Sequence, residues 1–158
     1  MNLEIERKFL VTNTSFIQES FDKKIIKQGF LNSNKNRVVR VRISDEQGFL
    51  TIKGKSNESG TSRFEFEKEI SREEATLLLA LCEKEILEKT RYLVKSGVHD
   101  FEVDVFSGKN QGLIVAEVEL DKEDEQFEKP SWLGKEVTGN VLYYNSELSK
   151  NPYTSWKI

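Results

Sequence analysis

The sequence lacks the marks of several common classes of protein. Cys82 is the only cysteine among 158 residues, which excludes an internal disulfide and a cluster of thiolate metal ligands. Because nothing then requires an oxidising compartment, we expect a cytoplasmic protein. No long apolar run is present, and Met1–Phe9 alternates charged and apolar residues from the start. We therefore expect neither a signal peptide nor a segment that crosses a membrane.

A strong excess of charge of one sign is also missing. The 24 Lys and Arg residues nearly balance the 27 Asp and Glu residues and leave a net charge of −3. Proteins that bind nucleic acids usually carry a basic surface, so we expect no nucleic-acid partner. The hydrophobic content of 37% is enough for one core but not for two. Since no repeat or linker divides the chain, we expect a single domain over residues 1–158.

What the sequence does contain is a repeated alternation of apolar side chains with period two, which is typical of β-strands. It predicts seven strands, at Leu3–Val11, Val38–Ser44, Phe49–Lys53, Arg63–Ile70, Leu87–Val94, Asp100–Phe106 and Leu113–Asp121. Gln28–Leu31 is a candidate for an eighth strand. Helices are fewer. Ser71 and Glu74 have the spacing of a capping box at the start of a helix that runs to about Glu83. Shorter helices are expected at Ser15–Phe21, Asp121–Glu128 and Tyr143–Ser149.

Each predicted strand has one apolar row and one charged row, because residues two apart share a face. The charged rows contain pairs of like charge, at Glu4/Glu6, Arg40/Arg42, Glu65/Glu67, Lys89/Arg91 and Glu117/Glu119. For any single strand, the simplest interpretation is an antiparallel sheet with its polar face in water. Like charges repel when they lie opposite each other across strands. The recurring pairs therefore favour a second interpretation, in which acidic and basic strands face each other across a closed lumen.

In this second interpretation, the lumen holds metal cations on carboxylates and a polyanion on Arg and Lys side chains. The apolar rows then point outward, and closing the sheet removes its unpaired edges. The helices that begin near Ser15 and Ser71 can cover part of the apolar exterior. Because the rest stays uncovered, a homodimer is a further expectation.

The segment Glu4-Ile5-Glu6-Arg7-Lys8 resembles the E-x-E-x-K signature of the CYTH domain, or triphosphate tunnel metalloenzyme, superfamily. Other segments resemble family elements in the same order: Arg40-Val41-Arg42, Thr51-Ile52-Lys53, Glu65-Phe66-Glu67, Glu88–Tyr92, Asp104-Val105-Phe106, Glu117-Val118-Glu119 and Trp132–Thr138. The resemblance covers nearly the whole chain. It implies an α+β, mainly β fold, with a closed eight-stranded antiparallel β-barrel, a charged lumen and a few helices packed outside.

The resemblance also implies roles for the charged residues. Metal ligands for Mg²⁺ or Mn²⁺ would be Glu4, Glu6, Asp104, Glu117 and Glu119, assisted by Glu65 and Glu67. Phosphate oxygens would be bound by Lys8, Arg40, Arg42, Lys53, Arg63, Lys89 and Arg91, of which Lys8, Lys53, Lys89 and Arg91 are the expected catalytic residues. The alternative for each carboxylate pair is a salt bridge to a facing Arg or Lys. No general base is assigned.

Three functions remain open. The short chain is similar to bacterial inorganic triphosphatases, so the leading expectation is a metal-dependent triphosphatase that hydrolyses the terminal phosphoryl group of tripolyphosphate or of an organic triphosphate. A class IV-like adenylate cyclase and a non-catalytic polyphosphate- or nucleotide-binding module are the alternatives. Two positions depart from the family pattern. Phe30 stands where several relatives have tyrosine, and the neutral Asn140-Val141-Leu142 stands where relatives often have an acidic and two basic residues.

Overall fold

The protein, seen here in a computed structural model, is described over residues 3–83 and 85–156. Within these residues the chain forms nine strands in one antiparallel sheet. Their bounds are β1 Leu3–Val11, β2 Asp22–Asn32, β3 Arg37–Ser44, β4 Gln47–Gly54, β5 Ser62–Ile70, β6 Leu87–Ser96, β7 His99–Phe106, β8 Ile114–Glu119 and β9 Leu133–Glu136. All seven predicted strands are present within a few residues, and the candidate at Gln28–Leu31 is the end of the longer β2.

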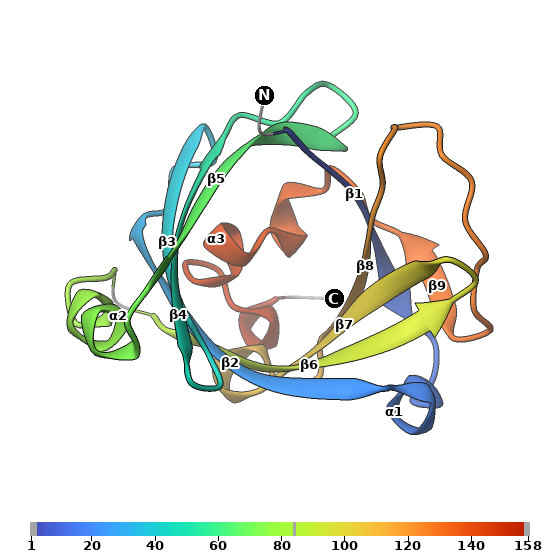
Figure 1. Ribbon diagram of the computed structural model, residues 1–158, viewed down its shortest axis with the longest axis horizontal. Coiled ribbons are helices and arrows are strands. Elements are labelled where there is room, and N and C mark those ends of the chain that lie inside the picture. Colours follow the sequence, from blue (N-terminus) through green and yellow to red (C-terminus); the bar gives the residue numbers. More distant parts are fainter. Residues whose placement is uncertain (1–2, 84, 157–158) are drawn as a thin grey trace.

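The sheet closes because β1 has two sets of neighbours. The strand order is β5-β4-β3-β2-β6-β7-β8-β1-β9, and an additional pairing joins β1 to β5. Leu3–Ile5 pairs with β5, whereas Glu6–Leu10 pairs with β8. Strands β1 to β8 therefore form a closed eight-stranded barrel, and β9 is an extra strand beside the last part of β1 (Figure 1). The predicted fold class is confirmed.

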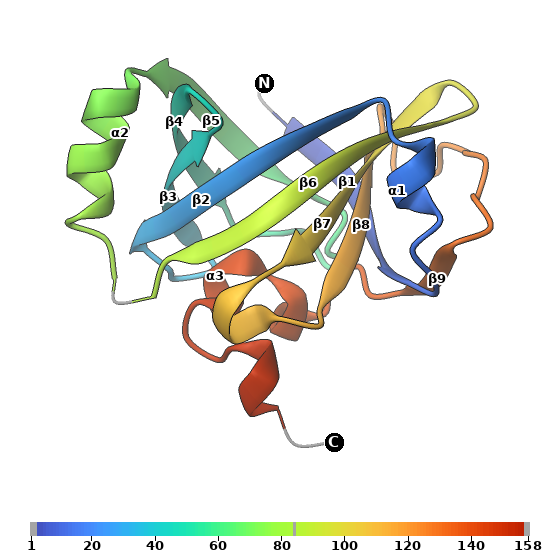
Figure 2. The same cartoon turned by 90° about the horizontal axis from the view of Figure 1, so that it is seen from below.

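The described residues form three α-helices, α1 Phe16–Glu19, α2 Arg72–Leu79 and α3 Asn145–Leu148. Single turns of 3₁₀-helix lie at Gly108–Asn110, Val141–Tyr143 and Tyr153–Ser155. Both hydrogen bonds of the predicted capping box at Ser71 and Glu74 are present at the start of α2. Helices α1 and α2 lie outside the barrel, whereas α3 lies across one of its open ends (Figures 1 and 2). None of the described helices is long and apolar enough to cross a membrane.

The largest hydrophobic cluster lies outside the barrel wall, as the second interpretation of the strands requires. Phe16 of α1 and Trp132, which precedes β9, are fully buried against Phe101 of β7 and Val118 of β8. The Trp132 ring meets the rings of Phe16 and Phe101 edge to face, with centroids 5.8 and 5.6 Å apart. The apolar rows of these strands are thus buried by exterior segments, and the charged rows point into the lumen.

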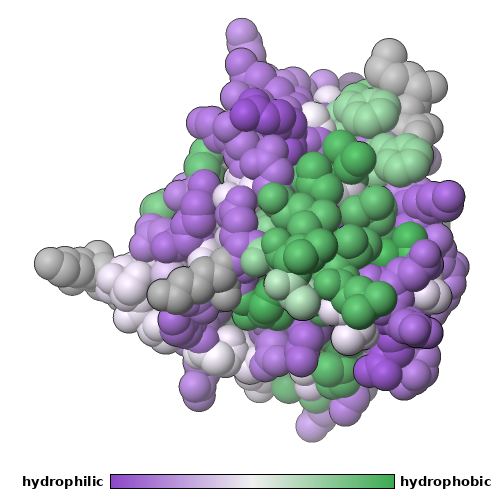
Figure 3. Space-filling view, turned by 90° about the vertical axis from the view of Figure 1, so that its left-hand side faces the viewer, coloured by the Kyte–Doolittle hydropathy of each residue, from purple (hydrophilic) through white to green (hydrophobic). Residues whose placement is uncertain are grey.

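Another part of the exterior stays uncovered. On the side that carries α2, Figure 3 shows a broad apolar surface. Exposed side chains there are Ile52, Phe64 and Phe66 on β4 and β5, Leu77 on α2 and Leu81 just after it. We call these five residues the apolar patch.

One predicted helix is wrong, and one strand was not predicted. Asp121–Glu128 forms turns and irregular backbone. The Glu125 carboxylate accepts the N–H of Asp121 at 2.7 Å and contacts His99, and Glu123 accepts hydrogen bonds from the loop between β4 and β5. Such side-chain hydrogen bonds compete with those of a helix. Strand β9 is only four residues long and alternates too little to be recognised in the sequence.

Candidate active site in the barrel lumen

The barrel encloses a cavity of about 170 Å³ whose wall is almost entirely charged. The alternating rows of the strands explain this lining, since seven of the eight barrel strands turn charged side chains inward, whereas β2 contributes Phe30. The predicted site residues in the cavity wall are Glu4, Glu6, Lys8, Arg40, Arg42, Lys53, Arg63, Glu65, Glu67, Lys89, Arg91, Glu117 and Glu119. Thirteen of the fourteen predicted residues are thus brought together from strands far apart in the sequence. Asp104 is the exception.

Carboxylates crowd one part of the lumen. Glu6 of β1 pairs in register with Glu119 of β8, and Lys8 pairs with Glu117. Burial and the charge of Glu117 raise the pKa of Glu6 well above its usual value. Burial alone would also raise the pKa of Glu117, but the charge of Lys8 and a hydrogen bond from Glu6 hold it well below the usual range. The two adjacent carboxyl groups therefore titrate as a coupled pair, with the pKa of Glu6 raised and that of Glu117 lowered.

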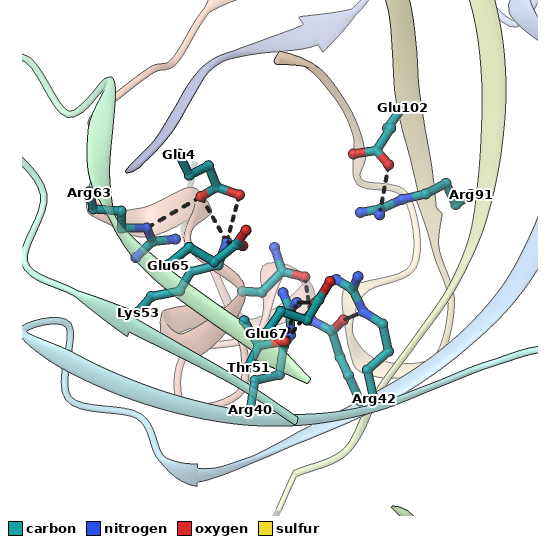
Figure 4. A network of polar contacts seen from close by, with 12 residues as sticks. Glu4, Arg40, Arg42, Thr51, Lys53, Arg63, Glu65, Glu67, Arg91 and Glu102 are labelled. Atoms are coloured by element: carbon teal, nitrogen blue, oxygen red, sulfur yellow. Dashed lines mark hydrogen bonds and ion pairs between the residues drawn. The ribbon is translucent and has the colours of Figure 1, made fainter. Parts of the chain in front are cut away.

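The same repulsion extends to the neighbouring strands. Burial, followed by the charge of Glu4, raises the pKa of Glu65 to about 7 and also raises the pKa of Glu119. The Lys53 ammonium lies 2.9 Å from Glu4 Oε1 and 3.5 Å from Glu65 Oε2 (Figure 4). This group of carboxylates thus accommodates a positive charge at hydrogen-bond distance.

The donor chemistry of this acidic group fits a hard divalent cation, which prefers oxygen ligands. Over residues 3–83 and 85–156, however, no three His, Cys, Asp or Glu side chains are arranged as a metal site in this structure. The fit therefore rests on the identity and crowding of the carboxylates. A bound cation would relieve the repulsion that raises the pKa of Glu6 and Glu65.

Cations occupy the facing part of the lumen. Burial lowers the pKa of Arg42 to about 9, with the charges of Arg40 and Arg91 adding to the effect. Burial likewise lowers the pKa of Lys89 to about 7. Within the described part of the chain, Arg40 Nε and Arg63 Nη1 are buried and have no hydrogen-bond acceptor. Buried donors of this kind are rare in proteins, and both side chains belong to the cavity wall, where an anion is the partner that guanidinium groups suit best.

Asp104 lies behind the cations and does not line the cavity. Its carboxylate accepts two hydrogen bonds from Arg91, at 2.8 and 3.0 Å, and forms a 2.8 Å ion pair with Lys89. Burial by itself would raise the pKa of Asp104, but Arg91 and Lys89 hold it well below its usual range. This arrangement is a salt bridge to facing cations, which is the alternative to metal binding that the sequence leaves open for the carboxylates. A metal-binding role for Asp104 stays a prediction.

Several lumen residues escaped the sequence analysis. Glu102 lines the cavity and lies 3.2 Å from Arg91 Nη1, and its place on the charged row of β7 could have revealed it. Thr51 of β4 donates to Glu67 at 2.8 Å and accepts from Arg40 at 3.1 Å (Figure 4). Asn145 of α3 also lines the cavity, but it carries no charge and belongs to no motif that marks it in the sequence.

Comparisons with known proteins agree with this architecture. A family model described as CYTH domain matches residues 2–152. The chain is 45% identical to an inorganic triphosphatase of Acetivibrio thermocellus over 99% of both chains. It is 36% identical to an inorganic triphosphatase of Nitrosomonas europaea, over 92% of this chain and 96% of that one. The crystal structure of the inorganic triphosphatase NE1496 matches with a TM-score of 0.66 and 33% identity, and covers 92% of this chain and 97% of that chain. The chain therefore belongs to the CYTH domain family.

Proposed function

We propose that the protein is a metal-dependent triphosphatase that hydrolyses the terminal phosphoryl group of inorganic tripolyphosphate inside the barrel. The observation that carries the proposal is the pair of buried donors on Arg40 and Arg63, unsatisfied among the described residues, in a cavity lined by cations and carboxylates. The names of the two inorganic triphosphatases, 45% and 36% identical to this chain, support the same activity. The whole of residues 1–158 would act as one domain.

The size and lining of the cavity favour an inorganic substrate over a nucleotide. Pockets for drug-sized ligands are usually about 300 to 1,000 Å³, whereas this cavity is about 170 Å³. Phe30 and Val38 are the only apolar residues among the described residues in its wall. Both belong to a packed cluster at the α3 end, so they offer no free face on which a base can stack. An adenylate cyclase needs such a seat for adenine and ribose.

The reaction needs neutralisation of charge and a water molecule in line with the leaving oxygen more than it needs a covalent nucleophile. We assign the binding of phosphate oxygens to the lumen cations, namely Lys8, Arg40, Arg42, Lys53, Arg63, Lys89 and Arg91. Buried guanidinium groups suit this task because they donate several hydrogen bonds in a fixed plane. Lys89 Nζ can take up or release a proton near neutral pH, because burial lowers its pKa to about 7.

The acidic group would hold the metal, which we expect to be Mg²⁺ or Mn²⁺. Its proposed ligands are Glu4, Glu6, Glu117 and Glu119, with Glu65 and Glu67 in support. A cation bound there supplies Lewis-acid polarisation of phosphoryl oxygens and lowers the pKa of a bound water molecule. The carboxylates also repel phosphate groups when no cation is bound, so a bound metal is expected to strengthen the binding of substrate to the lumen cations.

The proposal is tested by incubating the protein with tripolyphosphate, ATP or thiamine triphosphate in the presence of Mg²⁺ or Mn²⁺ and identifying the products. We expect orthophosphate and pyrophosphate from tripolyphosphate, and no release in EDTA. Cyclic AMP with pyrophosphate from ATP would indicate a cyclase, and binding without turnover would indicate a binding module. Arg63→Gln should lower turnover at least tenfold, whereas Arg7→Gln should not, because Arg7 pairs with Glu136 on the barrel exterior.

We also propose that the protein forms a homodimer through the apolar patch. Its five side chains are between 37% and 72% exposed, which amounts to roughly 500 Å², and a stable interface buries about 800 Å² per partner including its polar rim. The apolar patch therefore supplies most of the area that each protomer would bury against a second copy of the chain. Light scattering should give twice the monomer mass for the wild type and the monomer mass for Phe64→Glu. A monomeric wild type at micromolar concentration would refute the dimer.

The single cysteine keeps the cytoplasm as the expected location.

A further inference from the structure

The C-terminal segment crosses the end of the barrel and reaches into the lumen with a neutral side chain. Asn145 is the first residue of α3, and its Oδ1 accepts hydrogen bonds from Lys89 Nζ and from Gln28 Nε2, both at 2.8 Å. Gln28 Oε1 in turn accepts a hydrogen bond from Arg42 Nε at 3.1 Å. Gln28 is fully buried and Lys89 is 3% exposed. Three hydrogen bonds thus link α3 to β2, β3 and β6.

The chemistry of the donors fixes the orientation of both amides. A protonated lysine and an arginine have donors and no acceptor, so when Lys89 is charged Asn145 turns its oxygen toward Lys89, and Gln28 turns its oxygen toward Arg42. The nitrogen of Gln28 then faces the oxygen of Asn145, where it makes the connecting bond. In these three hydrogen bonds every donor faces an acceptor, so each amide can adopt only one orientation.

Neighbouring residues of the same segment contact further cations. The carbonyl oxygen of Tyr143 accepts from Lys8 Nζ at 3.3 Å. The Tyr144 ring lies 5.3 Å from Lys8 Nζ and 5.4 Å from Arg63 Cζ, within the range of cation–π interactions. The Tyr144 hydroxyl lies 3.3 Å from Ser56 Oγ. Residues 143–145 therefore touch three of the seven predicted phosphate-binding cations directly.

We propose that Asn145 is a positioning residue for the phosphate-binding cations, holding Lys89 directly and Arg42 through Gln28. The inference rests on the proposed function and adds a role that α3 plays in it. The segment brings no cation of its own, since Asn140–Leu142 is neutral, and instead orients cations that the barrel supplies. A neutral acceptor suits this task, because it fixes the ammonium without cancelling the positive charge that the phosphate needs.

Two substitutions of Asn145 separate positioning from a structural role. Asn145→Leu removes the acceptor at similar volume, so Lys89 keeps its ion pair with Asp104 but is no longer held toward α3, and we expect kcat for tripolyphosphate to fall at least tenfold. Asn145→Asp keeps an acceptor for both hydrogen bonds but adds a negative charge to the lumen, so we expect KM to rise at least tenfold with a smaller change in kcat. A merely structural role would lower the melting temperature and the active fraction in both variants without this split. Asn151→Leu is the matched control, because its Oδ1 accepts from Ser155 outside the lumen.

A binding measurement keeps the inference independent of turnover. Calorimetry with tripolyphosphate in EDTA should show at least tenfold weaker binding for Asn145→Asp than for the wild type, and unchanged binding for Asn151→Leu. If the wild type binds tripolyphosphate without hydrolysing it, the proposed function fails while this comparison still decides the inference. If both Asn145 variants fold and keep kcat, KM and Kd within twofold of the wild type, the inference is wrong. If Asn145→Leu does not fold, Asn145→Asp decides by itself, and unchanged KM and Kd in that variant would refute the inference.

Discussion

Replacing Asp104 by asparagine tests the most deeply buried ion pair of the barrel. The Asp104 side chain is 3% exposed and neutralises Arg91 and Lys89, whose side chains are 10% and 1% exposed. Asn has the same shape but carries no charge, and only one of its two side-chain positions can accept a hydrogen bond. In Asp104→Asn, Lys89 therefore stays buried without this counter-charge, Arg91 keeps only the half-exposed Glu102 as an ionic partner, and at least one of their donors meets an NH₂ group.

The expected cost follows from this geometry. Removing one partner of a buried ion pair typically costs about 3 to 5 kcal/mol, because the remaining charge is left uncompensated. In a protein of this size, 1 kcal/mol shifts the melting temperature by about 2 to 4 °C. Asp104→Asn should therefore lower the melting temperature by about 6 to 20 °C. Asp100→Asn on the same strand is the matched control. Asp100 pairs with Lys95 at the surface, where its side chain is 51% exposed, and such pairs contribute about 1 kcal/mol or less.

The assay is thermal and urea unfolding of the wild type and both variants in EDTA without phosphate, monitored by circular dichroism. We expect the large loss in Asp104→Asn and a shift within about 4 °C in Asp100→Asn. Equal small shifts in the two variants would refute the reasoning, because Asp104 would then not compensate buried cations in the folded protein.

Three smaller effects follow from other contacts. Gly60→Ala should cost about 1 to 3 kcal/mol, since φ is +77° and a Cβ would lie 2.3 Å from Gly139 Cα; equal urea midpoints would contradict this. Ser71→Ala removes the cap of α2 and should cost about 0.5 to 2 kcal/mol in the same assay, and an unchanged midpoint would rule out the cap. Hydrogen bonds from Arg7 lower the pKa of Glu136, so its stabilisation, about 1 kcal/mol or less, is present above pH about 4.3 and is lost as the pH falls below it. The stability difference between wild type and Glu136→Gln should thus be fully present near pH 7 and shrink as the pH falls through the lowered pKa of Glu136, and equal stability of the two proteins at pH 7 would contradict the pairing.

The sequence predicts the wall of the site well because strand alternation is a local property. Glu65 and Glu67 share a face wherever the strand lies, and the same holds for Arg40 and Arg42. Whether that face meets water or a lumen depends on the pairing of Leu3–Ile5 with β5, which joins segments about 60 residues apart. Only the structure shows this closure, although the recurring like charges and the family resemblance pointed to it.

The contacts of neutral and buried side chains in the lumen could not be predicted in the same way. Gln28 and Asn145 carry no charge, and their function depends on contacts across 117 residues of sequence. Asp104 belongs to a charged row, yet its carboxylate is buried against Arg91 and Lys89 and does not reach the cavity surface. The acidic segment Asp121–Glu128 has helix-forming residues, but its carboxylates bind neighbouring groups instead.

The central claim is that the lumen hydrolyses a triphosphate with a metal held by its carboxylates. The most direct test compares orthophosphate release from tripolyphosphate by the wild type, Glu117→Gln and Glu136→Gln in Mg²⁺ or Mn²⁺. Substitution of outer residues of metal sites typically costs 10- to 100-fold, so loss of a ligand at Glu117 should lower the rate by more than about 100-fold while the protein stays folded. Glu136→Gln, outside the lumen, should keep the wild-type rate. Full turnover by a folded Glu117→Gln variant, or a wild-type rate that EDTA does not change, would contradict the account.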